Sequence, residues 1–168
     1  AHPLVERLLD AVLRCWENWK GRRSDAPAVA LADWPGVGTR PEQEAIRDRF
    51  RARGLRCTLE DPSQMWWKGG ALRGSAGPVD LVYRRVVSEE LFSGSGVRAP
   101  EFVEGYKAGG FCCVGGFCTD PAWSKILFAF ISDPAYEGWF EERDRAVLKA
   151  CIPWTRLVAD GEAGWDGR

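Results

Sequence analysis

Hydrophobic side chains recur along this chain with two different spacings, and segments of the two kinds alternate. Spacings of three and four residues, typical of one face of a helix, occur in five stretches, 4–19, 39–54, 100–108, 120–131 and 141–150. Short apolar runs bounded by Gly, Pro or Asp occur in four other stretches, 28–33, 55–59, 79–87 and 111–114. We expect helices in the first set and buried strands in the second.

The stretch from 39 to 54 carries the clearest helix signals. Thr39 and Glu42 have the spacing of a capping box, and Pro41 suits the first turn of a helix. Gly54 is a suitable residue for the helix end. We therefore expect the side chains of Thr39 and Glu42 to cap this helix.

The order of the predicted elements is strand, helix, strand, hairpin, strand, helix, strand, helix. The hairpin is expected at 65–73, with its turn at Lys68-Gly69-Gly70. The run 79–87 is apolar on both faces for most of its length, as in a central strand covered on both sides. This order predicts an α/β fold with three layers, in which a mostly parallel, Rossmann-like sheet has helices on both faces and carries a small β-hairpin.

Length and charge narrow the classes of function. The chain has 168 residues, which favours one main domain. We expect an N-terminal helix and linker at 1–27, the α/β domain at 28–156, and a linker at 157–168. Lys and Arg number 23 and Asp and Glu 24, so the basic excess of a nucleic-acid-binding protein is absent. No run approaches the ~20 apolar residues of a membrane span, and we expect a cytoplasmic protein without a membrane or nucleic-acid partner.

The number and spacing of the cysteines decide whether they could bind a metal ion. The chain has six cysteines and one histidine, His2, and it contains no CxxC pair. A thiol or metal centre built on Cys112, Cys113 and Cys118 is one possible interpretation. We expect instead reduced, mostly buried thiols and no metal site.

Two places are expected to face a ligand, because ligands of open parallel sheets bind beyond the carboxyl ends of the strands. The first is the loop after the first strand, which leads into a helix N-terminus and suits a carboxylate or phosphate. Its candidate binding residues are Trp34, Gly36, Gly38, Thr39 and Arg40. The alternative is that this loop is only a turn.

The second place is the end of the predicted central strand, where Tyr83, Arg84 and Arg85 follow one another. Neighbouring residues on a strand point to opposite faces, so one of the two arginines can face a given cleft. An arginine there matches a carboxylate at two points. The alternative is that it pairs with an Asp or Glu of the protein itself. Lys125, near the start of a later helix, reads from its position alone as a surface lysine.

Several short segments together resemble a known family. They are Ala30–Val37, Val79–Val86, Tyr106–Gly109, Ser124–Leu127 and Ile152–Arg156. In this order they resemble circularly permuted ATP-grasp proteins, a group that includes glutathionylspermidine-synthase-like proteins. They are also similar to the substrate-binding domain of eukaryotic-type glutathione synthetases. The resemblance extends from about Val29 to Arg156 and implies the substrate-side, pre-ATP-grasp domain.

The resemblance implies an ATP-dependent ligase that joins a carboxylate to an amine. Arg85 matches an arginine that meets a small carboxylate or peptide-like substrate, and Lys125 matches a lysine that reaches the nucleotide phosphates. The family's nucleotide-binding core would follow Ile152–Thr155 and does not occur before Arg168. We therefore expect ATP and Mg²⁺ to serve the full-length enzyme, with the missing core of the same polypeptide as partner. This chain alone is expected to bind neither and to hold no catalytic residue.

A second interpretation belongs to a different class of protein. A stand-alone α/β domain could share this fold and bind a small molecule or a partner without catalysis, since fold alone does not define function. Binding of a carboxylate that depends on Arg85 would favour the ligase interpretation.

Overall fold

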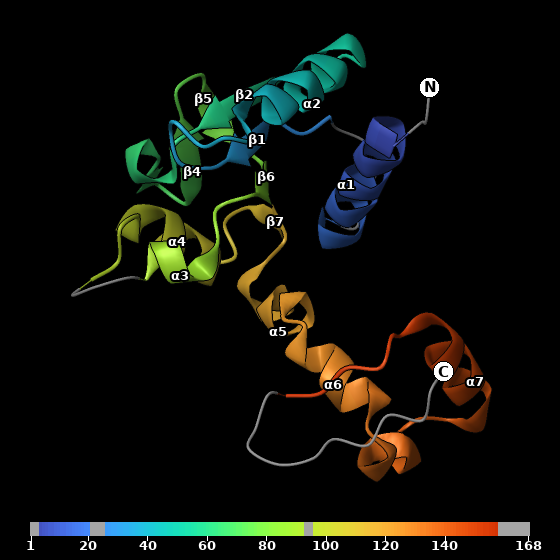
Figure 1. Cartoon of the computed structure of the whole chain (residues 1–168). Helices are drawn as coiled ribbons and strands as arrows, with labels where there is room; N and C mark the ends of the chain where they lie inside the picture. The colour runs from blue at the N-terminus through green and yellow to red at the C-terminus, as the bar shows by residue number, and fades with distance from the viewer. Residues whose placement is uncertain (1–3, 21–25, 93–95, 158–168) are drawn as a thin grey trace. The chain divides into compact units, whose positions relative to one another are not determined.

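The computed structural model describes residues 4–20, 26–92 and 96–157. The chain forms two compact units, Ala1–Phe117 and Cys118–Arg168, which we call unit 1 and unit 2. All strands of the described residues lie in unit 1, and the described part of unit 2 is built from short helices (Figure 1).

A parallel sheet of four strands forms the centre of unit 1. Its strands are β1 (Val29–Ala32), β2 (Cys57–Glu60), β6 (Leu81–Arg84) and β7 (Cys112–Val114), in the spatial order β2-β1-β6-β7. All three neighbouring pairs run parallel. The four strands predicted from the short apolar runs are therefore present, and the α/β class is confirmed.

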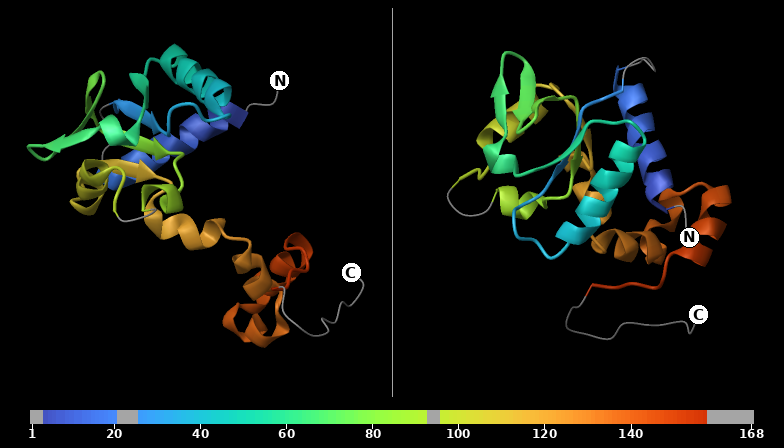
Figure 2. Two further views of the ribbon diagram at one scale, coloured as in Figure 1. Left: turned by 60° about the vertical axis from the view of Figure 1, so that its left-hand side comes forward. Right: turned by 90° about the horizontal axis from the view of Figure 1, so that it is seen from above.

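Successive side chains of each strand point to opposite faces of the sheet, and both faces are covered by other elements. Val29 and Leu31 pack with buried residues of α1 (Leu4–Lys20) and α2 (Arg40–Ala52). Ala30 and Ala32 pack in a second cluster, with residues of the small sheet and of α4 (Pro100–Lys107). The right-hand view of Figure 2 shows α1 and α2 on one side of the sheet and α4 on the other.

A second, antiparallel sheet lies beside the first. It consists of β3 (Trp66–Lys68), β4 (Ala71–Gly74) and β5 (Gly77–Val79) in that order. The predicted hairpin is confirmed as the β3–β4 pair. Short helices η1 (Pro62–Gln64), α3 (Ser88–Leu91) and η2 (Phe117–Thr119) complete the connections.

The prediction of one continuous strand over 79–87 was wrong, because the chain changes sheets at Asp80. The Asp80 carboxylate accepts a hydrogen bond from the backbone N–H of Ala28 at 2.8 Å. The backbone N–H groups of Asp80 and Leu81 both donate to the Ala28 carbonyl, at 2.9 and 3.1 Å. These bonds end β5 and start β6, so one apolar run serves two sheets.

The predicted capping box at the start of α2 does not form. Thr39 makes no side-chain cap, and its hydroxyl oxygen instead accepts a hydrogen bond from the Gln43 side chain at 3.2 Å. The Glu42 carboxylate lies against the Arg85 guanidinium instead of the Thr39 backbone. Thr39 is thus engaged by a residue one turn along α2, and Glu42 by a residue 43 positions away.

Unit 2 contains α5 (Asp120–Trp123), α6 (Ile126–Ser132), η3 (Pro134–Trp139) and α7 (Glu142–Cys151). The single helix expected over 120–131 is therefore two helices, since Ser124 has extended backbone with ψ 132°. The side chain of Asp133 caps η3 by accepting a hydrogen bond from the Ala135 N–H.

Candidate functional site

The order of the parallel strands defines a point where the winding of the sheet reverses. From β1 the chain passes to β2 on one side, and it later returns to place β6 on the other side of β1. The carboxyl ends of these strands lie level, since Ala32 is in register with both Glu60 and Arg84. Such a reversal is where ligands of open α/β sheets bind. The sheet thus brings the loop after β1 and the end of β6 to one edge, as predicted.

A buried amide anchors the loop after β1. The Gln43 side chain is 1% exposed and donates to the Asp33 carboxylate at 2.6 Å. The other carboxylate oxygen of Asp33 accepts the backbone N–H of Trp34 at 2.9 Å. Sequence reasoning missed both residues. The available signal was a polar residue, Gln43, three positions before Ile46 on the buried stripe of α2.

The loop residues after Trp34 are exposed or half-buried. Gly36 has φ +78°, a backbone conformation that favours glycine. A Cβ on Gly38 would meet no atom within 4 Å, so open space surrounds this residue. Arg40 pairs with Glu44 one turn along α2 at 3.4 Å. The loop therefore presents backbone to its surroundings, while its one arginine already has a carboxylate partner.

Trp34 is buried, with 8% of its surface exposed. The guanidinium of Arg98 stacks on the indole at 4.0 Å from the ring centroid. Within the described residues, the indole N–H of Trp34 is buried and has no acceptor. A buried donor without a partner costs roughly 1–3 kcal/mol, so an oxygen atom that reached it would stabilise the protein. Arg98 is a third residue that the sequence did not single out.

Arg84 serves the internal structure of unit 1. Its guanidinium donates to the carbonyl oxygens of Gly115 and Val86 and, at 3.0 Å, to the Ser88 hydroxyl. It also lies 4.7 Å from the centroid of the Phe117 ring. These bonds tie the ends of β6 and β7 together. Because two of its partners are backbone carbonyls of the protein itself, this arginine is fixed in place.

Arg85 is held differently, by a side-chain carboxylate. Its two terminal nitrogens lie 3.1 and 3.3 Å from the two oxygens of Glu42, in the first turn of α2. The side chain of Arg85 is 21% exposed and that of Glu42 is 56% exposed. Burial acts to lower the pKa of Arg85, but its hydrogen bonds to Glu42 and Tyr83 outweigh burial and raise it. The guanidinium also lies 5.9 Å from the centroid of the Tyr83 ring. In this structure, then, Arg85 has the internal carboxylate partner considered above as the alternative.

Lys125 and the acidic side chains are the residues that bear on binding of ATP and Mg²⁺. Lys125 is an exposed residue just before α6, in unit 2, where its ammonium could meet a phosphate. No group of three or more His, Cys, Asp or Glu side chains within 4–20, 26–92 and 96–157 is placed to hold a metal ion. Lys125 is thus placed where it could serve a nucleotide, and the described residues do not fit a magnesium site.

The six cysteines all lie in the described part of the chain, and none of them forms a disulfide there. Cys57 and Cys112 are buried, and burial raises the pKa of each thiol to about 11. Cys15, Cys118 and Cys151 are exposed, and Cys113 is half-buried. No helix among the described residues has the length and apolar character needed to cross a membrane.

No protein-family model matches the chain, and no curated protein matches its sequence. Any assignment of function therefore depends on the residues and the geometry given above.

Proposed function

We propose that unit 1 binds the carboxylate of a small or peptide-like substrate at the carboxyl edge of its parallel sheet. In this proposal unit 1 is the Rossmann-like, pre-ATP-grasp domain on the substrate side of an ATP-dependent carboxylate–amine ligase. The observation that carries it is the pairing of Arg85 with an exposed carboxylate, Glu42, where the winding of the sheet reverses.

The Arg85–Glu42 pair is suited to exchange. Glu42 is more than half exposed, and an ion pair with such a solvated partner contributes only about 0–1 kcal/mol. The guanidinium of Arg85 is less exposed and presents two parallel N–H donors, the geometry that a carboxylate matches. A substrate carboxylate can therefore replace Glu42 with little loss, and Glu42 keeps the arginine oriented until then.

Other groups at the same edge would hold the rest of the substrate. The loop at Gly36–Thr39 leads into the N-terminus of α2, where the helix dipole favours a negative charge. The buried indole N–H of Trp34 has no acceptor among the described residues and could donate to an oxygen of the substrate. Arg84 supports the site indirectly, by fixing the end of β6 against β7.

The ligase class follows from the resemblance of the five segments, which agrees with the strand end that carries Arg85. In such a ligase the carboxylate would attack the γ-phosphorus of ATP to form an acyl phosphate, with ADP as the leaving group. An amine would then attack the acyl carbon to form the amide, and inorganic phosphate would leave. The residues of this chain would bind and orient the carboxylate, and Lys125 would supply a cation to the phosphates. A ligase of this kind works in the cytoplasm, and the free thiols support that location.

The test is calorimetric titration of the chain with amino acids and dipeptides. Arg85→Ala should lower the affinity for the carboxylate that binds best by about tenfold or more, because a charge-assisted hydrogen bond contributes roughly 1.5–3 kcal/mol. Arg47→Ala is the matched control, since Arg47 lies on the same helix as Glu42 and pairs with Asp48. Equal binding by wild type and Arg85→Ala would remove Arg85 from the site and favour a stand-alone binding module.

A further inference from the structure

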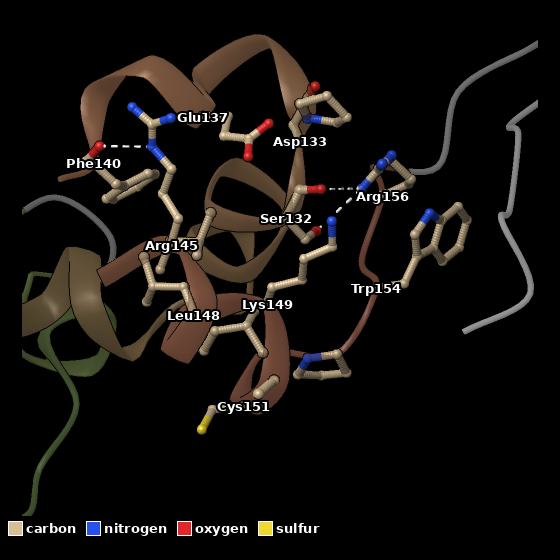
Figure 3. A pocket seen from close by; sticks show the side chains of 15 residues that line it. Ser132, Asp133, Glu137, Phe140, Arg145, Leu148, Lys149, Cys151, Trp154 and Arg156 are labelled. Atoms are coloured by element: carbon tan, nitrogen blue, oxygen red, sulfur yellow. Dashed lines mark hydrogen bonds between the residues drawn. The ribbon is translucent and has the colours of Figure 1, made fainter. Parts of the chain in front are cut away.

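Unit 2 contains a cavity of about 620 Å³ that the proposed function does not use (Figure 3). It lies among the end of α6, η3, α7 and the segment 152–156. Its volume falls within the ~300–1,000 Å³ of small-molecule sites. Apolar side chains form much of the wall, among them Ile131, Phe140, Leu148, Ile152 and Trp154.

Three basic side chains line the same cavity: Arg145, Lys149 and Arg156. Arg145 donates from Nε to the Phe140 carbonyl at 2.9 Å. Arg156 donates from one terminal nitrogen to the carbonyls of Thr155 and Ser132, at 2.7 and 3.2 Å. Both guanidinium groups are thus held by neutral carbonyls, which leave their full charge in place.

The two carboxylates of the wall do not neutralise these charges. Asp133 accepts the Ala135 N–H at 2.9 Å as the cap of η3. Within the described part of unit 2, neither Asp133 nor Glu137 lies within ion-pair distance of the three cations. On the outside of α7, by contrast, Arg143 pairs with two carboxylates, Glu141 at 2.9 Å and Asp144 at 3.5 Å. Within the described part of unit 2, the three cations of the cavity thus lack the carboxylate partners that Arg143 has.

Like charges gathered in one concave space repel each other, and an oxyanion placed between them removes that repulsion. Figure 3 shows the Lys149 side chain reaching from α7 toward the side of the cavity formed by Ser132 and Arg156. Trp154 stands beside them, 39% exposed, with the Arg156 guanidinium 4.9 Å from its ring centroid. An indole that keeps this much exposed surface next to a cation offers a platform for a planar group.

We propose that this cavity binds a small organic oxyanion, a phosphate ester or a carboxylate, whose anionic group meets Lys149 and Arg156. The planar or apolar part of the molecule lies against Trp154 and the apolar wall. Arg145 contributes charge from the opposite part of the cavity, beside Phe140. This site belongs to unit 2 and does not depend on the carboxylate site of unit 1.

The test is amide NMR of the full chain, titrated with phenyl phosphate, benzoate and inorganic phosphate at constant ionic strength. Saturable shifts confined to residues 131–156 are expected. Tighter binding of phenyl phosphate would identify the natural ligand as a phosphate ester, and tighter binding of benzoate would identify it as a carboxylate. Phenyl phosphate or benzoate should bind more tightly than inorganic phosphate, because only they reach Trp154. Shifts that do not saturate, or that spread evenly over basic residues elsewhere, would overturn the proposal.

Variants separate specific binding from a general effect of charge. Lys149→Ala should weaken the tighter of the two aromatic anions about tenfold, equivalent to about 1.4 kcal/mol, and Lys149→Arg should restore most of the affinity. Arg143→Gln, on the same helix but outside the cavity, should bind as the wild type does. Circular dichroism identifies any variant that fails to fold. Equal losses in Lys149→Ala and Arg143→Gln would show that net charge alone attracts the anion and would refute a built site.

Discussion

Replacement of Asp80 with Ala removes the side chain that directs the chain from the small sheet into the parallel sheet. Its carboxylate accepts the backbone N–H of Ala28, a residue that is 5% exposed and directly precedes β1. The substitution leaves this donor buried without a partner, which costs roughly 1–3 kcal/mol. The backbone bonds of Asp80 and Leu81 to the Ala28 carbonyl remain. We therefore expect the free energy of unfolding of unit 1 to fall by about 2 kcal/mol.

Urea denaturation followed by tryptophan fluorescence measures this loss. With a slope of about 1–3 kcal/mol per molar urea, the midpoint should fall by roughly 1 M. Asp80→Asn is the control, because its amide oxygen still accepts the Ala28 N–H, and it should lose less than half as much. Hydrogen exchange at the Ala28 amide should accelerate in Asp80→Ala alone. Similar midpoints for the Ala and Asn variants would refute the role given to this hydrogen bond.

Two further predictions concern the core. Gly110→Ala should destabilise unit 1 by about 1–3 kcal/mol, because the added Cβ would overlap the Trp67 ring. Gly38→Ala is the control and should melt like the wild type, because open space surrounds Gly38. Equal melting temperatures for the two variants would contradict this prediction. Thiols of the unfolded chain ionise near pH 9, whereas burial raises the pKa of Cys57 and Cys112 in the folded chain to about 11. The free energy of unfolding should therefore fall as the pH rises between these two values. Urea midpoints at pH 8.5 and 10.5 should therefore drop less for Cys57→Val than for wild type, and equal drops would show that this thiol keeps its ordinary pKa in the fold.

The sequence predicted the elements whose patterns are local. Strands with buried side chains on both faces, such as 29–32, stood out as apolar runs, and the β3–β4 hairpin was marked by its two glycines. The break at Asp80 was missed because its cause is a bond to Ala28, 52 residues away. A carboxylate inside an apolar run has no fixed meaning until its distant partner is known.

The candidate site shows the same limit. The sheet brings the loop after β1 and the end of β6 to one edge, which follows from strand polarity and could be expected from the sequence. The separate tasks of Arg84 and Arg85 could not, since one is fixed by the Gly115 carbonyl and the other by Glu42. Arg98 was overlooked because its contact with Trp34 connects residues 64 positions apart in the chain.

The central claim is that a substrate carboxylate takes the place of Glu42 on Arg85, and NMR of the terminal Nη–H resonance of Arg85 observes that exchange directly. Addition of the amino acid or dipeptide that binds best should shift this resonance saturably, together with the backbone amides of residues 34–40. Glu42→Gln, which frees the guanidinium, should bind the same ligand at least as tightly as wild type. A resonance of Arg85 that stays unchanged while the ligand binds elsewhere would contradict the account.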